Sequence, residues 1–135
     1  MSNEQSVPLR DTQLRALWMA RIDYSPSSGV FPHAHDDFFQ LLVILGGRGV
    51  VQVECQDYTV GENSYCLFPR GTMHGFRFSA DTLTLDFKFR VEDDRLARML
   101  SSSDLIGQCA PEDLAQLKQW FELSLKNERH PSPLL

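Results

Sequence analysis

The chain of 135 residues has no long apolar run. Its longest apolar stretch lies around Phe38–Gly47 and is interrupted by Gln40, whereas a membrane-spanning helix needs about 20 apolar residues. The first ten residues are polar and lack the apolar centre of a signal peptide. These absences predict a cytoplasmic protein that does not contact a membrane.

Cysteine is scarce. The three cysteines, Cys55, Cys66 and Cys109, are odd in number and form no CxxC pair. This spacing indicates neither a disulfide framework nor a zinc knuckle, so we expect free thiols.

Positive charge is also in short supply, with 13 basic against 18 acidic residues and a net charge of −5. Binding to phosphate groups requires a basic face. We therefore expect no direct nucleic-acid binding by this segment, although an acidic sensor can be joined to a basic DNA-binding domain elsewhere.

Residues 14–91 have the residue pattern of β-strands. The length of the whole chain suits one domain. Short runs rich in Val, Phe, Tyr, Leu and Thr are separated by Gly, Pro, Ser and Asp. The expected strands are Leu17–Tyr24, Phe31–His35, Phe38–Leu45, Gly49–Glu54, Tyr58–Val60, Ser64–Phe68, His74–Phe78 and Leu83–Val91. Strands this short and close together are typical of a sandwich or barrel.

Two details of the β region make specific predictions. In the last strand Leu83, Leu85, Phe87 and Phe89 alternate with Thr84, Asp86 and Lys88, and we expect the polar set to face solvent. Gly46-Gly47 predicts a turn, because glycine accepts a positive φ without steric cost.

After Val91 the pattern predicts helices at residues 93–100 and 111–126. An apolar stripe on the second helix consists of Leu114, Leu117, Phe121 and Leu125, widened by Trp120. Two interpretations stay open: the stripe packs against the barrel, or it faces a partner such as a second copy of the chain. We expect residues 1–13 to be a flexible arm and residues 127–135 to be a linker-like tail, so that the chain is the front part of a longer protein.

Three histidines of the β region have a spacing that can bring them together as metal ligands. His33 and His35 are an i, i+2 pair, which on a strand places both imidazoles on one face. Gln40 lies on the next strand and His74 on a distant one, so these side chains meet only if the sheet curls into a barrel. The set predicts a divalent metal site for Zn, Fe, Ni or Mn, with neutral ligands throughout. The alternative is a polar pocket whose groups hydrogen-bond to one another.

At these residues the sequence resembles the cupin superfamily. Gly29-Val30-Phe31-Pro32-His33-Ala34-His35, with Gln40 and Gly47, resembles the first cupin motif, and Gly61 with Pro69-Arg70-Gly71-Thr72-Met73-His74 resembles the second. The resemblance implies a mainly β fold, a cupin double-stranded β-helix over residues 14–91 followed by C-terminal helices over residues 92–126. Gln40 and Phe78 depart from the pattern, since cupin enzymes usually carry glutamate and often asparagine there.

The helical extension makes the chain more similar to the N-terminal ligand-sensing domain of AraC-type transcriptional regulators. That resemblance implies a small-molecule ligand, a homodimer formed through the C-terminal helices and a DNA-binding domain that is absent from this segment. The apolar ligand pocket would include the positions taken as barrel-facing, Phe31, Leu42, Phe76 and Leu85.

Two further functions remain as alternatives. One is a stand-alone metal-dependent enzyme of the sugar isomerase, uronate lyase or dioxygenase type, for which Tyr65, Arg70 and Asp86 are candidate bases by residue type alone. The other is a binding module without metal or catalysis. Catalysis is the less favoured interpretation, because no acid or base stands out beside the motif.

Overall fold

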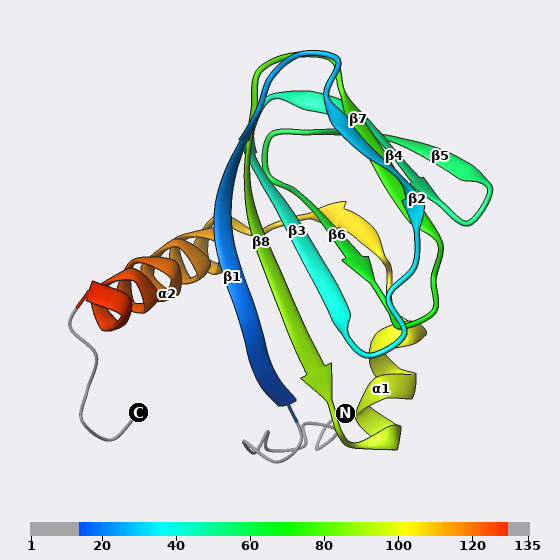
Figure 1. The fold of residues 1–135 in the computed structure, drawn as a ribbon, viewed down its shortest axis with the longest axis vertical. Helices are drawn as coiled ribbons and strands as arrows, with labels where there is room; N and C mark the ends of the chain where they lie inside the picture. Colours follow the sequence, from blue (N-terminus) through cyan, green and yellow to red (C-terminus); the bar gives the residue numbers. More distant parts are fainter. Residues whose placement is uncertain (1–13, 130–135) are drawn as a thin grey trace.

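Nine strands form two antiparallel sheets in residues 14–129, the part of the chain that the computed structural model describes, with side chains to Leu123 (Figure 1). The strands are β1 (Leu14–Tyr24), β2 (Gly29–His33), β3 (Phe39–Gly46), β4 (Arg48–Val53), β5 (Gln56–Gly61), β6 (Ser64–Phe68), β7 (His74–Phe78), β8 (Thr82–Val91) and β9 (Ile106–Gln108). The predicted arm at residues 1–13 and the last residues of the predicted tail, 130–135, lie outside this range.

The chain crosses repeatedly between the two sheets. One sheet has the order β1-β8-β3-β6-β9 and the other the order β2-β7-β4-β5. All eight expected strands are present within a few residues of their predicted ends, and the mainly β prediction is confirmed. The three-residue β9, which pairs with the edge of β6, was not predicted, because so short a segment has no readable alternation.

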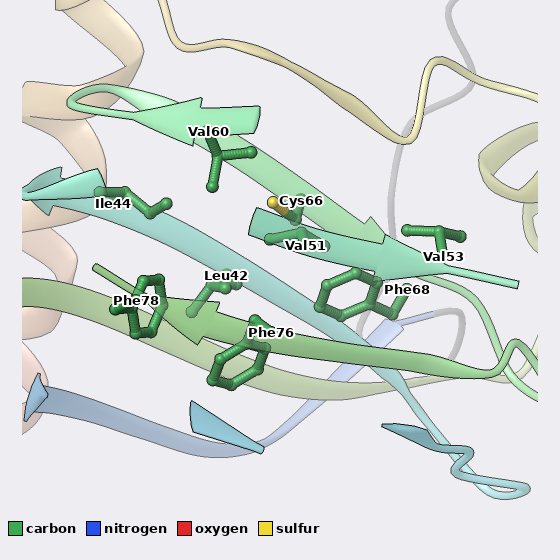
Figure 2. Close-up of a cluster of buried hydrophobic side chains, with 9 residues drawn as sticks. All are labelled: Leu42, Ile44, Val51, Val53, Val60, Cys66, Phe68, Phe76 and Phe78. Carbon is green, nitrogen blue, oxygen red and sulfur yellow. The ribbon is translucent and has the colours of Figure 1, made fainter. Parts of the chain in front are cut away.

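The core lies between the sheets, as Figure 2 shows. Alternate residues of five strands point inward and exclude water, with Phe68, Phe78 and Leu42 at 0–1% exposure. The full cluster comprises Leu42, Ile44, Val51, Val53, Val60, Cys66, Phe68, Phe76 and Phe78. Gln40 precedes Leu42 on the inner face of β3 by two residues, and His74 precedes Phe76 on β7 in the same way. The apolar core therefore gives way to a polar region at this end of the sheets.

The faces of β8 are the reverse of those predicted. Thr84 and Asp86 are 0% and 3% exposed and pair across the strands with the inward-facing Ile44 and Leu42. Leu85 instead packs on the outer face beneath the C-terminal helix. The prediction of a solvent-facing polar set was wrong because the outer face of this sheet is covered by helices and needs the apolar residues there.

Two helices cover that outer face. The first, α1 (Asp94–Ser101), begins at Asp93, whose side chain accepts a hydrogen bond from the Leu96 amide at 2.9 Å. It packs against an apolar cluster that includes Phe39 and Val91. Neither α1 nor α2 is long and apolar enough within the described residues to cross a membrane.

The second helix, α2 (Pro111–Arg129), lies beside β1 (Figure 1). Leu114, Leu117 and Phe121 pack on the sheet, which supports the first interpretation of the stripe. Trp120 and Leu123 are 53% and 49% exposed, so the helix also carries an uncovered apolar side. The predicted stripe residue Leu125 lies beyond the described side chains.

The expected turn at Gly46-Gly47 is present between β3 and β4. Gly47 has φ 106°, and a Cβ atom there would lie 2.3 Å from Oγ1 of Thr82. Only glycine fits this position without strain. The turn returns the chain from one sheet to the other.

Candidate metal centre

Three histidines converge at one end of the barrel. His33 is the last residue of β2 and pairs across the strands with His74, the first residue of β7. His35 lies in the loop after β2 and not on the strand itself, so the predicted pair on one strand is only half correct. Their rings nevertheless meet: the His33 centroid is 4.6 Å from that of His35 and 4.5 Å from that of His74. One ligand atom from each of the three lies within 4.8 Å of the others.

Backbone carbonyls fix the tautomers of two of these rings. Nδ1 of His33 lies 2.9 Å from the carbonyl oxygen of Phe31, and Nδ1 of His74 lies 2.9 Å from that of Thr72. Because a carbonyl oxygen only accepts, each Nδ1 carries the proton and each Nε2 presents a lone pair. Histidines that bind a metal usually donate their other ring nitrogen to a carbonyl or carboxylate in this way.

The spacing of the nitrogen atoms also suits an ion. Nε2 of His33 and Nε2 of His35 are 3.1 Å apart, and without an ion they form a hydrogen bond in which Nε2 of His35 donates to the lone pair of His33. Two ligands at right angles around an ion, each at about 2.1 Å, would be separated by about 3.0 Å. Neutral imidazoles at this distance fit adjacent coordination positions.

Gln40 supplies a fourth group. It is 5% exposed, and its amide nitrogen donates to Oδ2 of Asp86 over 3.5 Å, while its Oε1 has no partner. Nε2 of His74 likewise has none, and these are the two unsatisfied buried side-chain atoms of the described residues. Buried polar atoms are nearly always satisfied. Both of these are acceptors, so a cation or a donor is what would complete them.

Burial keeps these groups in the state that ligation requires. Desolvation lowers the pKa of His74 to about 4, against a hydrogen bond to Thr72, and the neighbouring histidines and Lys88 lower it further. Desolvation also lowers the pKa of His35, followed by repulsion from His33, whereas the nearby Gln40 opposes the shift. Both imidazoles are therefore neutral at neutral pH, as metal binding demands.

Asp86 is the carboxylate of this region. Burial raises its pKa to about 6, although Thr84, whose hydroxyl donates to Oδ1 at 2.9 Å, Lys88 and Gln40 all favour its ionised form. Of the three candidate bases, only Asp86 reaches the site. The Tyr65 hydroxyl donates to the Asp104 carbonyl, and the Arg70 guanidinium lies over the ring of Phe39.

Aromatic rings hold two of the histidines in place. The His74 ring stacks on Phe68 with centroids 4.1 Å apart and an interplanar angle of 6°. The His35 ring stacks on Phe38 at 4.4 Å and 26°. Such packing restricts ring rotation, which keeps the nitrogen atoms directed at one point.

The four expected pocket residues separate into two pairs. Leu42 and Phe76 belong to the inner core. Leu85 packs outside the barrel under α2, and Phe31 is 85% exposed on the outer surface, so the expectation that these two face the barrel interior was wrong. Phe31 instead lines an outer hollow of about 520 Å³ together with Val50, Gln52 and Arg77 among others. Phe31 and Leu85 point outward because side chains alternate along a strand, and each of them is adjacent in sequence to an inward-facing residue.

The sequence did not mark Asp86 or Lys88 as neighbours of the histidines. The alternation in β8 was read correctly, but its apolar face was assigned to the interior. The signal that would have corrected this is the apolar stripe of α2, since a helix that packs on the outside needs an apolar outer face beneath it.

Comparison with known proteins agrees with this architecture. A structure of KdgF from Halomonas sp. is similar over 63% of this chain and 74% of its own, with 21% identity and a TM-score of 0.52. A predicted oxalate decarboxylase from Thermotoga maritima is similar over 57% and 69%, with 25% identity and a TM-score of 0.54. An RmlC-like cupin from Shewanella frigidimarina is similar over 62% and 72%, with 17% identity and a TM-score of 0.52.

These likenesses confirm the cupin fold. No curated protein matches the sequence significantly. The model of one family, described as the AraC-like ligand binding domain, matches residues 19–135. That match spans most of the strands and both helices, so the chain belongs to the family of AraC-like ligand-binding domains.

Proposed function

We propose that this chain is the small-molecule sensor of an AraC-type transcriptional regulator and that it holds a divalent metal through His33, His35, Gln40 and His74. The observation that carries the metal is the convergence of Nε2 lone pairs, fixed by backbone carbonyls, with the unpaired Oε1 of Gln40. A bound ion would act as a Lewis acid and as an anchor for ligand oxygen atoms. Its neutral ligands would leave the full charge of Zn, Fe, Ni or Mn available to the ligand.

Metal binding is tested by elemental analysis of protein purified without chelator, followed by calorimetric titration with Zn²⁺, Fe²⁺, Ni²⁺ and Mn²⁺. We expect one equivalent of metal and a loss of at least about 100-fold in affinity for His33→Ala, which removes a ligand. Gln52→Ala on the outer hollow is the matched control and should bind as the unaltered protein does. A protein that neither contains nor takes up any of these ions has a polar pocket in place of a metal centre.

The regulatory part of the proposal rests on the family and on α2. A cytoplasmic sensor of this kind needs a ligand that binds two arrangements of its helices with different affinity. The uncovered side of α2, with Trp120 and Leu123, suits a homodimer. Trp120→Glu should shift a dimer to monomer in sedimentation experiments, while Glu122→Gln, an exposed polar change on the same helix, should not.

A metal-dependent enzyme of the isomerase, lyase or dioxygenase type is the second candidate. Asp86 favours it, because a buried carboxylate with a pKa of about 6 beside Gln40 suits proton transfer near neutral pH. Turnover of a sugar, a uronate or an O₂-dependent substrate by the metal-loaded protein, abolished by Asp86→Asn, would establish this function in place of sensing.

A further inference from the structure

Lys88 brings a positive charge to the inner face of β8. It pairs across the strands with Gln40 on one side and Trp18 on the other, and it lies two residues from the inward-facing Asp86. Its side chain therefore belongs to the same face as the candidate metal centre. A cation at this position is unusual, since the inner face of β8 is otherwise buried at Thr84 and Asp86.

Two aromatic rings hold the ammonium in place. Nζ of Lys88 lies 4.6 Å from the Trp18 ring centroid and 5.4 Å from that of Phe38. Phe38 in turn stacks on His35. The chain of contacts from Trp18 to His35 places the ammonium beside the histidine cluster, with one aromatic ring shared between them.

The ammonium forms no close ion pair within the described residues, although the buried Asp86 carboxylate attracts it over a longer distance. No carboxylate oxygen among them lies within 4.0 Å of Nζ, and no hydrogen bond from it is formed. Its three donors remain available, and aromatic faces supply no acceptor that would occupy them fully. A cation held in position without an acceptor is suited to a ligand that brings one.

The charge balance of the region points the same way. His33, His35, His74 and Gln40 are neutral ligands, Asp86 is the buried carboxylate beside them, and the exposed Asp36 adds a negative charge near His35. A dication there, together with Lys88, would leave the inner face with an excess of positive charge. An anionic ligand neutralises this excess, whereas a neutral sugar would accept hydrogen bonds from Lys88 and leave its charge uncompensated.

We propose that the ligand is a small organic carboxylate, which pairs with Lys88 and lays its apolar part against Trp18 and Phe38. The remaining oxygen atoms of the ligand reach the histidine centre. This inference rests on the proposed small-molecule sensing and narrows its ligand class from sugars, acids and other metabolites to acids.

The test is calorimetric titration of the full chain with acetate, benzoate and phenylacetate, each compared with its neutral amide, and with a neutral hexose. At least one carboxylate should bind about 10-fold or more tightly than its amide. Lys88→Met keeps the apolar stem and should remove this preference, whereas Lys88→Arg should retain it. Arg21→Met, an exposed change on β1, is the matched control and should leave the preference intact.

Equal binding of every carboxylate and its amide, tighter binding of the hexose, or a preference that survives in Lys88→Met would overturn the inference. Circular dichroism and thermal unfolding of Lys88→Met show that the variant is folded. Titration of the unaltered protein with metal and with the carboxylates separates the two proposals. If metal binds but carboxylates are not preferred, the ligand class is wrong; if no metal binds and the preference persists, the metal centre is wrong and Lys88 still selects the anion.

Discussion

The amide nitrogen of Gln40 lies 3.5 Å from Oδ2 of Asp86, and this contact determines which end of the amide faces the histidines. A carboxylate accepts hydrogen bonds and therefore selects the NH₂ end. The carbonyl oxygen is left on the side of the cluster, without a partner. Asp86 therefore orients the proposed ligand Gln40 and is not itself one of the proposed ligands. It also adds a negative charge, which the four neutral ligands lack.

Asp86→Asn should reduce metal affinity by about 10- to 100-fold, the usual effect of removing a group that orients a metal ligand. Asparagine has the same shape but can present its own amide to Gln40, so the orientation of Oε1 is no longer fixed. Calorimetric titration measures the effect, with the exposed Asp57→Asn as the control for loss of one charge. Equal affinities in the two variants would show that other contacts fix the Gln40 amide.

Moving the charge from Asp86 to position 40 should strengthen metal binding. Gln40→Glu combined with Asp86→Asn keeps the net charge and places a carboxylate directly on the ion, so its affinity should exceed that of the unaltered protein by about 10-fold or more. Gln40→Glu alone should gain less, because two adjacent carboxylates resist joint ionisation. Weaker binding by the double variant at pH 7.5 contradicts a ligand role for residue 40.

The stability of the metal-free protein should depend on pH through His74. Its pKa is lowered to about 4 in the fold, so the unfolded chain binds a proton more readily than the native state between pH 6.5 and 4. The contribution of His74 to the free energy of unfolding is therefore intact above pH 6.5, and it falls by about 3 kcal/mol as the pH drops toward 4.

Asp86 acts in the opposite direction. Its pKa is raised from 3.8 to about 6, so its contribution is present below pH 3.8 and is lost as the pH rises through 6. Urea unfolding of Asp86→Asn isolates the effect of His74, and Asp86→Asn combined with His74→Gln is its control. Identical pH profiles of these two variants would mean that His74 titrates normally in the fold.

Gly47→Ala should destabilise the protein by about 2 kcal/mol or more, because its φ of 106° and the approach of Thr82 leave no space for a Cβ atom. The neighbouring Gly46→Ala is a strict control, since a Cβ there meets nothing within 4 Å. Thermal and urea unfolding distinguish the two. A similar midpoint for both variants would show that the turn relaxes around the added methyl group.

Much of the fold was predictable because its signals are local. Turn residues such as Gly47 and the period of each strand depend on neighbours in the chain, and they placed eight strands and two helices correctly. The convergence of His33, His35 and His74 was predictable for a different reason, since motif spacing carries the topology that brings distant strands together.

Which face of a strand points inward was not predictable from the strand itself. The alternation around Asp86 is the same whether the apolar residues meet the core or an outer helix, and only the packing of α2 decides between them. The position of His35 beyond the end of β2 was missed for a similar reason. Its ring reaches the site by stacking on Phe38, a contact within the loop that no pattern of strand residues encodes.

Leu85 and Asp86 are joined by a single peptide bond, yet one supports α2 and the other contacts Gln40. A bound molecule that shifts the backbone of β8 at Asp86 would also shift Leu85. Because packed interiors deform little, the surface on which α2 packs would move by a comparable amount. Under the proposed sensing function, two adjacent residues of β8 would therefore connect a bound molecule to the helix that carries the uncovered apolar side.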